Sequence, residues 1–399
     1  MIANSFGLGI ETSGRASFPT RFALGCTGCN CRHGLQGRAT WAPSYRHWAL
    51  QRYVNLARRL IRVNFATMRG RSRSIDTLRG LAAVAVVFRH SSSQFMLGSI
   101  GVDFFFVISG LVMANVSQGS TPAHFLKDRA WRIFPTYWLA LLPWLAIAIG
   151  AGQFSYWRAV GSIMLWPAWF GVDSSYLGVS WSLVYELLFY LAVAAAIYLR
   201  SVVLPLTIFA LALFVRPLWT NPVTDVIGSP IIFEFLFGAI IAHVRLSRLV
   251  GAGSFVAGLL WLANYPNIQL EGFAVAWSYG PAFQRVLLWG VPAAMIVYGS
   301  LCHERLFKGP VAEAMLVVGA ASYSIYLVHP LVTTWVELPW AMESAFAIGA
   351  GISFWWLVER RLKRRPQFKI WRRRPVATEL VVRSTSSAKL LTRPPAEPV

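Results

Sequence analysis

Ten long apolar segments divide this sequence, and they limit its possible folds more than any other feature. A helix needs about 20 apolar residues to cross the ~30 Å hydrocarbon core of a bilayer, and these segments approach that length with few charges. Hydrophobic residues make up 56% of the chain, with 18 Trp and 26 Phe, which is too apolar for a pair of soluble domains. We therefore predict an all-α, polytopic integral membrane protein with about ten transmembrane helices. The segments cover residues 78–95, 101–117, 133–151, 179–199, 202–218, 228–244, 249–264, 284–301, 314–334 and 345–358.

Positive charge is concentrated in alternate loops between these segments. The net charge of +21 would by itself also fit a nucleic-acid-binding protein. Lys and Arg gather on one side, as in cytoplasmic loops, whereas the other side holds only Arg158 and the edge residues Arg216 and Arg285. We therefore predict cytoplasmic termini and contact with membrane lipid, and no nucleic-acid partner. The basic side includes Arg73, Lys127, Arg200, Arg248, Arg305 and Arg364.

The first 67 residues differ from the rest of the chain. They hold nine Arg, no Lys and a single acidic residue, Glu11, with no apolar segment long enough to span a membrane. We interpret residues 1–67 as a basic extension that is either the product of a start codon set too far upstream, with Met68 as the natural start, or a disordered cytoplasmic tail. The transmembrane domain is predicted over 68–365, and a basic, disordered cytoplasmic tail over 366–399.

Cysteine usage does not indicate a metal or a disulfide. Cys26, Cys29, Cys31 and His33 lie close together, but a structural zinc site takes four ligands from two separated knuckles. The remaining cysteine, Cys302, has no partner in the sequence pattern. We predict no metal cofactor.

Ionisable residues inside apolar segments are the first candidates for function, because charge is costly in a bilayer. Arg79 and His90 are eleven residues apart, which in a helix brings them within about 20° of one face and roughly 16 Å along the axis. Neutral imidazole can accept a proton near neutral pH, so His90 is the candidate general base and Arg79 an anion or carbonyl partner. A snorkelling arginine and a packed histidine are the structural alternative.

Two carboxylates are candidates to assist His90. Asp103 lies at the predicted outer mouth of the second segment, where it is expected either to hold the imidazole tautomer or to cap a helix. Glu186 lies at an estimated depth similar to that of His90, roughly 10 Å below the outer surface, which suggests one shared site. His329 is a second histidine to test, with hydrogen-bonded packing as its alternative role.

A basic pair precedes the third apolar segment. Arg129 and Arg132 are three residues apart, so they are neighbours on one helix face and suit a phosphate ligand. The alternative is an ordinary membrane-surface helix that contacts anionic lipid. Farther along the chain, Glu359 is expected to pair with the basic residues that follow it.

These residues lie in runs that resemble the membrane acyltransferase 3 family over approximately residues 74–365. The resemblance rests on the segments Ser74-Ile-Asp-Thr-Leu-Arg-Gly-Leu-Ala-Ala, Gly101-Val-Asp-Phe-Phe-Phe-Val-Ile-Ser-Gly110, Arg129-Ala-Trp-Arg132, Ser180-Trp-Ser-Leu-Val-Tyr-Glu186 and Ser322-Tyr-Ser-Ile-Tyr-Leu-Val-His-Pro330. Within the family, the chain looks most like exopolysaccharide O-acetyltransferases. It departs at Leu187 and Leu188, where some members carry a second acidic residue and Gln.

The resemblance implies an enzyme of the bacterial inner membrane that takes acetyl from cytoplasmic acetyl-CoA, an acyl-CoA donor, and gives it to a glycan acceptor such as exopolysaccharide or lipopolysaccharide. His90, Glu186 and Asp103 are then the predicted catalytic residues, and Arg79, Arg129 and Arg132 the donor-binding ones. A direct transfer and a covalent acyl-histidine both remain open. The alternative function is a transporter or flippase of a lipid-linked sugar, although the two halves of the sequence show no convincing repeat.

Overall fold

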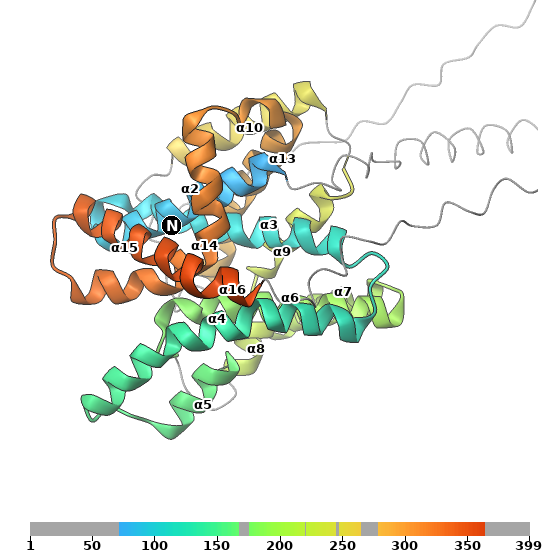
Figure 1. The fold of residues 1–399 in the computed structure, drawn as a ribbon. Coiled ribbons are helices and arrows are strands. Elements are labelled where there is room, and N and C mark those ends of the chain that lie inside the picture. The colour runs from blue at the N-terminus through green and yellow to red at the C-terminus, as the bar shows by residue number, and fades with distance from the viewer. Residues whose placement is uncertain (1–71, 167–174, 220, 245–246, 265–277, 364–399) are drawn as a thin grey trace, which may run out of the picture. The chain divides into compact units, whose positions relative to one another are not determined.

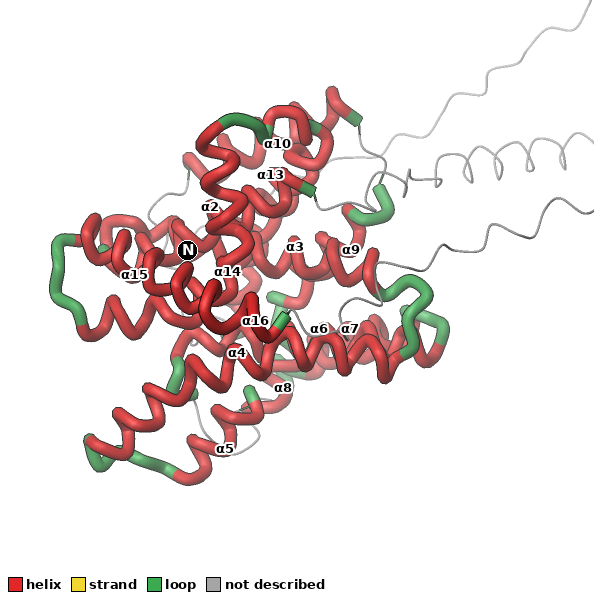
Figure 2. The backbone as a smooth tube through the Cα atoms, viewed as in Figure 1, coloured by secondary structure: helices red, strands yellow, loops and turns green. Residues whose placement is uncertain are grey.

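The computed structural model describes residues 72–166, 175–219, 221–244, 247–264 and 278–363, and every regular element within them is helical (Figure 1, Figure 2). The all-α prediction is therefore confirmed for these residues. The extension 1–67, with its Cys26 cluster, and the tail 366–399 lie outside the described residues. The first half contains α2 (Arg73–Ser91), η2 (Ser93–Ser99), α3 (Ile100–Val116), α4 (Pro122–Gly150), α5 (Tyr156–Met164), η4 (Gly178–Ser180), α6 (Trp181–Leu199), α7 (Val203–Val215) and α8 (Pro222–Ile227). The second half contains α9 (Ile232–Ile241), α10 (Arg248–Ala263), α12 (Tyr279–Arg285), η5 (Val286–Gly290), α13 (Val291–Cys302), η6 (Glu304–Leu306), α14 (Pro310–Trp335), α15 (Trp340–Phe354), η7 (Trp355–Glu359) and α16 (Arg360–Leu362).

Each of the ten predicted segments coincides with helix. Seven helical stretches in the described part of the chain are long and apolar enough to cross a membrane. Helices α7 and α10 are apolar but shorter, and α2 carries Arg73, Asp76, Arg79 and Arg89. That the chain crosses the membrane ten times, and that both termini lie on the cytoplasmic side, stay predictions. The seven stretches are Ser93–Val116, Pro122–Gly150, Gly178–Leu199, Pro222–Ile241, Tyr279–Cys302, Pro310–Trp335 and Trp340–Leu362.

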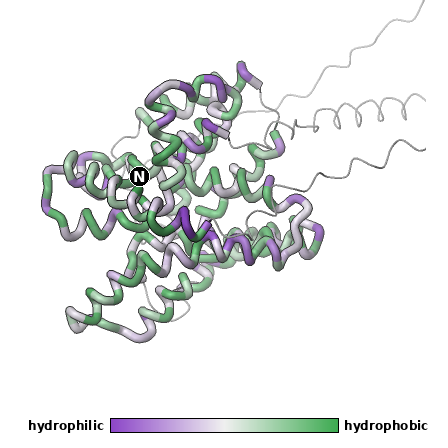
Figure 3. Tube along the Cα trace, in the orientation of Figure 1, coloured by the Kyte–Doolittle hydropathy of each residue, from purple (hydrophilic) through white to green (hydrophobic). Residues whose placement is uncertain are grey.

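Hydrophobic residues predominate along many of the helices (Figure 3), and many large apolar side chains are exposed on them. Tyr198 and Leu218 are each 78% exposed, and Phe214 on α7 is 73% exposed. A water-soluble protein rarely presents contiguous apolar surface of this kind. Helices with such faces match the solvent properties of a lipid bilayer.

Helix α2, which carries Arg79 and His90, packs against α14, α3 and α15 (Figure 1). Its close approach to α14 depends on two glycines. A Cβ added to Gly319 would lie 1.9 Å from the carbonyl oxygen of Asp76, and one added to Gly80 would lie 2.4 Å from that of Met315. Small residues at such crossings let helix backbones meet, so larger side chains there would push the His90 helix away from α14.

The start of α2 is held by a carboxylate from another part of the chain. Glu304 in η6 accepts hydrogen bonds from the Arg73 backbone N–H at 2.5 Å, from Ser72 Oγ at 3.0 Å and from Ser74 Oγ at 2.5 Å. A negative charge at a helix N-terminus also interacts favourably with the helix dipole. The contact fixes the first turn of α2 against the segment between α13 and α14.

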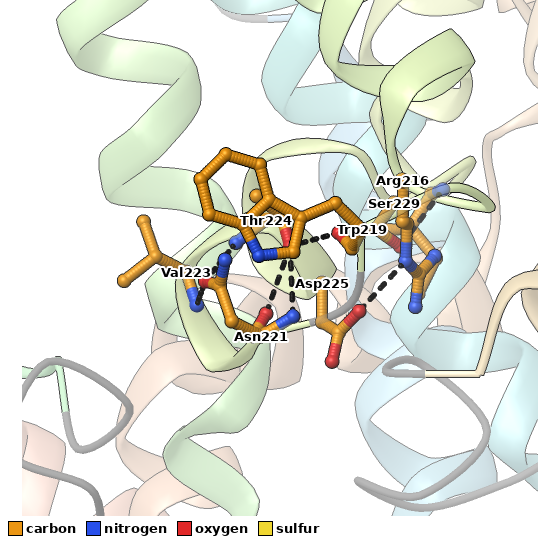
Figure 4. Close-up of polar contacts among 8 residues, drawn as sticks. Arg216, Trp219, Asn221, Val223, Thr224, Asp225 and Ser229 are labelled. Atoms are coloured by element: carbon orange, nitrogen blue, oxygen red, sulfur yellow. Dashed lines mark hydrogen bonds and ion pairs between the residues drawn. The ribbon is translucent and has the colours of Figure 1, made fainter.

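The corner between α7 and α8 is closed by local polar contacts (Figure 4). Asn221 Oδ1 accepts from the backbone N–H groups of Val223 and Thr224, each at 3.0 Å, and Thr224 Oγ1 accepts from the Asn221 N–H at 3.0 Å. Beside this capping box, Arg216 Nε donates to Asp225 Oδ1 at 3.2 Å. The sequence places Arg216 at the edge of an apolar segment, and the structure shows its side chain 2% exposed and paired with Asp225.

Candidate active site

Two cavities lie back to back among the helices and contain most of the predicted site residues. The first, here called the Arg79 cavity, has a volume of about 80 Å³ and is lined by Arg79, Arg132 and Glu186. The second, the His90 cavity, has a volume of about 660 Å³ and is lined by His90. Val102 and Tyr326 line both cavities. These two side chains therefore lie between the cavities.

The Arg79 cavity joins α2, α4 and α6. Glu186 Oε1 accepts hydrogen bonds from Ser109 Oγ at 3.2 Å and from the Tyr190 hydroxyl. The Nε of Arg79 is buried and has no hydrogen-bond partner among the described residues. A small polar chamber with two guanidinium groups and one carboxylate can bind an anionic or carbonyl group that enters it.

The predicted basic pair lies in α4, as expected, but its two members face different surroundings. Arg132 is half-buried and lines the Arg79 cavity, whereas Arg129 lines neither cavity. The Arg129 guanidinium lies 5.9 Å from the Phe125 ring centroid, and its Nη1 is 3.9 Å from Met113 Sδ. Arg132 is thus the member of the pair that faces the candidate site.

A further cation lies close to Arg132. Lys363, the residue after α16, donates to Glu359, which also accepts from Ser324 Oγ at 2.5 Å. This ion pair confirms the expectation that Glu359 binds a basic residue that follows it. Burial, together with the positive charge of Arg132, lowers the pKa of the Lys363 ammonium to about 8, and Glu359 opposes that shift. Positive charge therefore accumulates around Arg132.

His90, which lines the second cavity, lies beside a second histidine. His90 is an exposed residue in the last turn of α2, which ends at Ser91 rather than near Phe95 as predicted. Its ring centroid lies 5.0 Å from that of the fully buried His329 on α14. Nδ1 of His329 is 3.1 Å from the carbonyl oxygen of Ile325, and Nε2 has no partner among the described residues. Because a carbonyl only accepts, Nδ1 carries the proton and Nε2 is left as an acceptor.

Asp103 pairs with an arginine from α12. Both side chains are buried, at 0% and 1% exposure, and Asp103 Oδ1 and Oδ2 accept from Arg285 Nε at 3.0 Å and Nη2 at 2.7 Å. Glu234, which is also 0% exposed, belongs to the same cluster. Arg285 was expected at a segment edge, yet it is enclosed and lines the His90 cavity.

The structure thus groups Arg79, Arg132 and Glu186 in one cavity, whereas His90 lines the other and has the buried His329 beside its ring. No described contact joins His90 to Glu186 or Asp103, so their role in orienting its ring stays a prediction. Among the described residues, no three His, Cys, Asp or Glu side chains gather as a metal site. Sequence reasoning gave no role to Glu234 or Arg285, although both are charged residues inside apolar segments, which was the available signal.

Comparisons with known proteins show which family the chain resembles. Residues 72–360 match the acyltransferase domain family. The chain is 32% identical over 307 residues to the exopolysaccharide production protein ExoZ of Rhizobium meliloti (strain 1021), covering 68% of this chain and 92% of that protein. It is 26% identical over 350 residues to nodulation protein 10 of Rhizobium leguminosarum bv. viciae, covering 72% of this chain and 87% of the relative. It is also 26% identical over 292 residues to the putative membrane-bound transacylase BcsY of Komagataeibacter xylinus, covering 65% of this chain and 72% of that relative. No solved structure matches the chain.

Proposed function

The chain belongs to the acyltransferase family matched by residues 72–360, and we propose that it moves an acetyl group from cytoplasmic acetyl-CoA to a hydroxyl of a cell-surface or exported glycan. Membership of the family makes the chain an acyltransferase. The name of the relative ExoZ, an exopolysaccharide production protein, supports an exopolysaccharide as acceptor. Seven helices of membrane-spanning length and composition support a multi-pass protein, which we assign to the bacterial inner membrane.

The observation that carries this proposal is the pair of adjoining cavities. One is lined by arginines that suit a phosphate-bearing donor, and the other by a histidine that suits a hydroxyl acceptor. They share Val102 and Tyr326 in their linings, so a thioester bound in the Arg79 cavity would lie close to the His90 cavity. Group transfer requires the two substrates to be held close together in a defined orientation. Two adjoining cavities suit this requirement.

On the donor side, we assign Arg132 and Arg129 to the phosphates of the coenzyme, with Lys363 adding to the positive charge. Small-molecule sites usually occupy about 300 to 1,000 Å³, so the Arg79 cavity, at about 80 Å³, takes only the thin thioester end of the donor. Arg79 then faces the acyl carbonyl or the pantetheine arm. Glu186, which is hydrogen-bonded to Ser109 and Tyr190, orders the wall opposite these arginines.

On the acceptor side, His90 takes the proton of the attacking hydroxyl. The hydroxyl oxygen bonds to the thioester carbonyl carbon, the C–S bond breaks, and the proton passes from the imidazolium to the departing thiolate. The products are an acetyl ester and free coenzyme A. General-base assistance of this kind is typically worth about 10²- to 10⁴-fold in rate. An acyl-histidine route divides the same changes into two steps and also requires His90.

The test follows acetyl transfer into extracted cell-surface glycan by mass spectrometry, in a deletion strain carrying wild type or His90→Ala at matched membrane levels. His243→Ala is the control, because that exposed histidine, which follows α9, lines neither cavity. We expect acetate with wild type and the control, and its loss with His90→Ala. Equal acetate with His90→Ala would refute the catalytic assignment, and loss of the exported glycan itself would indicate a flippase.

A further inference from the structure

His329 has a buried ring nitrogen that no described residue satisfies. The side chain is 0% exposed and lies beside the His90 ring, with the two ring centroids 5.0 Å apart. Its Nε2 has no hydrogen-bond partner among the described residues. Such an atom is costly in a folded protein and requires an explanation. We propose that Nε2 accepts a hydrogen bond from a ring N–H of His90, which makes His329 the positioning residue of the proposed base. The inference rests on the proposed function, because it concerns how the base of that reaction is held.

The proton on the His329 ring is fixed by its own helix. Nδ1 lies 3.1 Å from the carbonyl oxygen of Ile325, one turn earlier in α14. A carbonyl oxygen only accepts, so Nδ1 carries the proton and Nε2 keeps its lone pair. Nε2 lies on the other side of the ring from Nδ1 and points away from the Ile325 carbonyl. The second ring nitrogen is therefore an acceptor that needs a donor.

Two aromatic rings are described beside His329, and one of them can supply this donor. The Tyr326 ring centroid is 5.9 Å away, but the Tyr326 hydroxyl donates its one proton to the carbonyl oxygen of Val179 at 2.7 Å. His90 has a ring N–H in either neutral tautomer and in the imidazolium. The separation of the two histidine rings lets a rotation of the exposed His90 side chain bring a nitrogen within about 3 Å of Nε2, the usual length of a hydrogen bond. Of the two described neighbours, His90 is thus the donor.

The contact between α2 and α14 places the two histidines at the same level. A Cβ added to Gly80 would lie 3.1 Å from the backbone nitrogen of Gly319, so these glycines mark one point where the helices meet. His90 follows Gly80 by ten residues, and His329 follows Gly319 by ten. At a rise of about 1.5 Å per residue, each histidine lies about 15 Å beyond its glycine, in two helices that run in the same direction. The register of the two helices therefore brings the histidines together.

The proposed hydrogen bond has a defined effect on His90. Donation from one ring nitrogen to His329 leaves the other nitrogen with its lone pair, available to a hydroxyl in the cavity that His90 lines. When this nitrogen takes the proton of the hydroxyl, the imidazolium keeps its first N–H bonded to Nε2, now as a charge-assisted hydrogen bond. A third group that orients a base in this way is the arrangement of a catalytic triad. The sequence assigned this role to Glu186 or Asp103, neither of which has a described contact with His90.

The direct test is nitrogen-15 magnetic resonance of the full chain, labelled at its histidines, in lipid nanodiscs. An N–H···N hydrogen bond couples its two nitrogens, so a cross-peak should join the rings of His90 and His329. The cross-peak should vanish in His329→Leu and persist in His303→Leu. His303 is the matched control, because its Nδ1 also lies 3.0 Å from a carbonyl oxygen one turn earlier, that of Gly299, and it lines neither cavity. Absence of the cross-peak in wild type, both with and without glycan extracted from the deletion strain, would overturn the inference.

A second measurement distinguishes positioning from packing. Acetyl transfer from acetyl-CoA to glycan extracted from the deletion strain is followed for His329→Leu and His329→Gln in the same nanodiscs. Gln offers an acceptor oxygen close to the position of Nε2, whereas Leu fills the space without one. We expect Leu to lower kcat about 100-fold, the cost of a misplaced catalytic group, and Gln to retain about 10-fold more activity than Leu, the worth of one hydrogen bond. The KM for acetyl-CoA should stay unchanged in both, because the donor is assigned to the other cavity. A packing role predicts the reverse order, since Gln would then bury an unpaired amide, and a Leu variant as active as Gln would overturn the inference.

The same experiments separate this inference from the proposed function. Full acetyl transfer by His90→Ala, together with a cross-peak in wild type, would refute the proposed base while the hydrogen bond between the histidines stands. Loss of transfer in His90→Ala without a cross-peak in wild type would keep the base and overturn the role of His329. If His329→Leu does not fold, the wild-type cross-peak and the comparison of His329→Gln with His303→Gln still decide.

Discussion

The buried pair of Asp103 and Arg285 gives a stability prediction that depends directly on the geometry. We consider Asp103→Asn, which keeps the shape of the side chain and removes its charge. Both partners are almost fully enclosed, at 0% and 1% exposure, so the remaining guanidinium would lose its counter-charge without gaining water. The perturbation therefore tests whether α3 and α12 are joined by charge or merely packed together.

The expected magnitude follows from two independent estimates. Opposite charges separated by about 4 Å attract by about 4 kcal/mol at an effective dielectric constant of 20. Removing one member of a buried ion pair costs about 3 to 5 kcal/mol in other proteins. We expect Asp103→Asn to lower the free energy of unfolding by an amount in that range. The paired variant Asp103→Asn with Arg285→Gln should lose less than the single one, because the guanidinium is then not left without Asp103.

The assay is equilibrium unfolding in mixed micelles titrated with sodium dodecyl sulphate, followed by circular dichroism. Glu313→Gln serves as the control, since Glu313 forms an ion pair with Arg73 in which the two side chains are 60% and 38% exposed. Exposed pairs contribute about 0 to 1 kcal/mol, so the control should unfold nearly like wild type. A single variant as stable as the control, or a paired variant less stable than the single one, would refute the reasoning.

Two further predictions concern the start of α2 and the basic residues of α4. Glu304→Gln should destabilise the first turn of α2 by about 1 to 2 kcal/mol, because it weakens charge-assisted hydrogen bonds to a helix N-terminus. Amide hydrogen exchange at residues 73–77 should then be faster than in wild type, while exchange in α6 should be unchanged. Exchange at residues 73–77 as slow as in wild type would contradict the role of Glu304. Arg132→Ala should raise the KM for acetyl-CoA by about 10- to 100-fold, the loss expected for a charge-assisted contact with phosphate. Lys127→Ala, an exposed neighbour on α4, should leave that KM unchanged, and equal KM values for the two variants would remove Arg132 from the donor site.

The sequence was sufficient to predict the helices, because a segment of apolar residues near the thickness of a bilayer has few other stable conformations. Their ends were harder to predict. The first apolar segment was predicted to run to Phe95, but α2 stops at Ser91 and the N–H of Ser92 bonds to the Phe88 carbonyl. Hydropathy averages over a window, whereas a helix ends at individual capping residues.

The depth of a residue along the bilayer could also be estimated from the sequence, but the residues that it contacts could not. Glu186 and His90 were placed at a similar depth and therefore in one site, yet they line different cavities. Depth follows from the helical rise, whereas contact depends on which helices adjoin and how each is rotated. The pairing of Asp103 with Arg285 illustrates the same limit, because 182 residues separate the two partners.

The ion pair with Arg285 also explains how Asp103, which lines neither cavity, can affect the shape of both. Val102 precedes Asp103 on α3 and is one of the two side chains that lie between the cavities. Successive helical residues point about 100° apart, so the bond from Asp103 to α12 sets the rotation at which Val102 is presented to the cavities. Tyr326 is fixed on the other side by its hydroxyl, which lies 2.7 Å from the Val179 carbonyl oxygen and 2.8 Å from Ser182 Oγ. The wall between the proposed donor and acceptor sites is thus held by polar contacts behind each of its two side chains, and a substitution at Asp103 should alter transfer as well as stability.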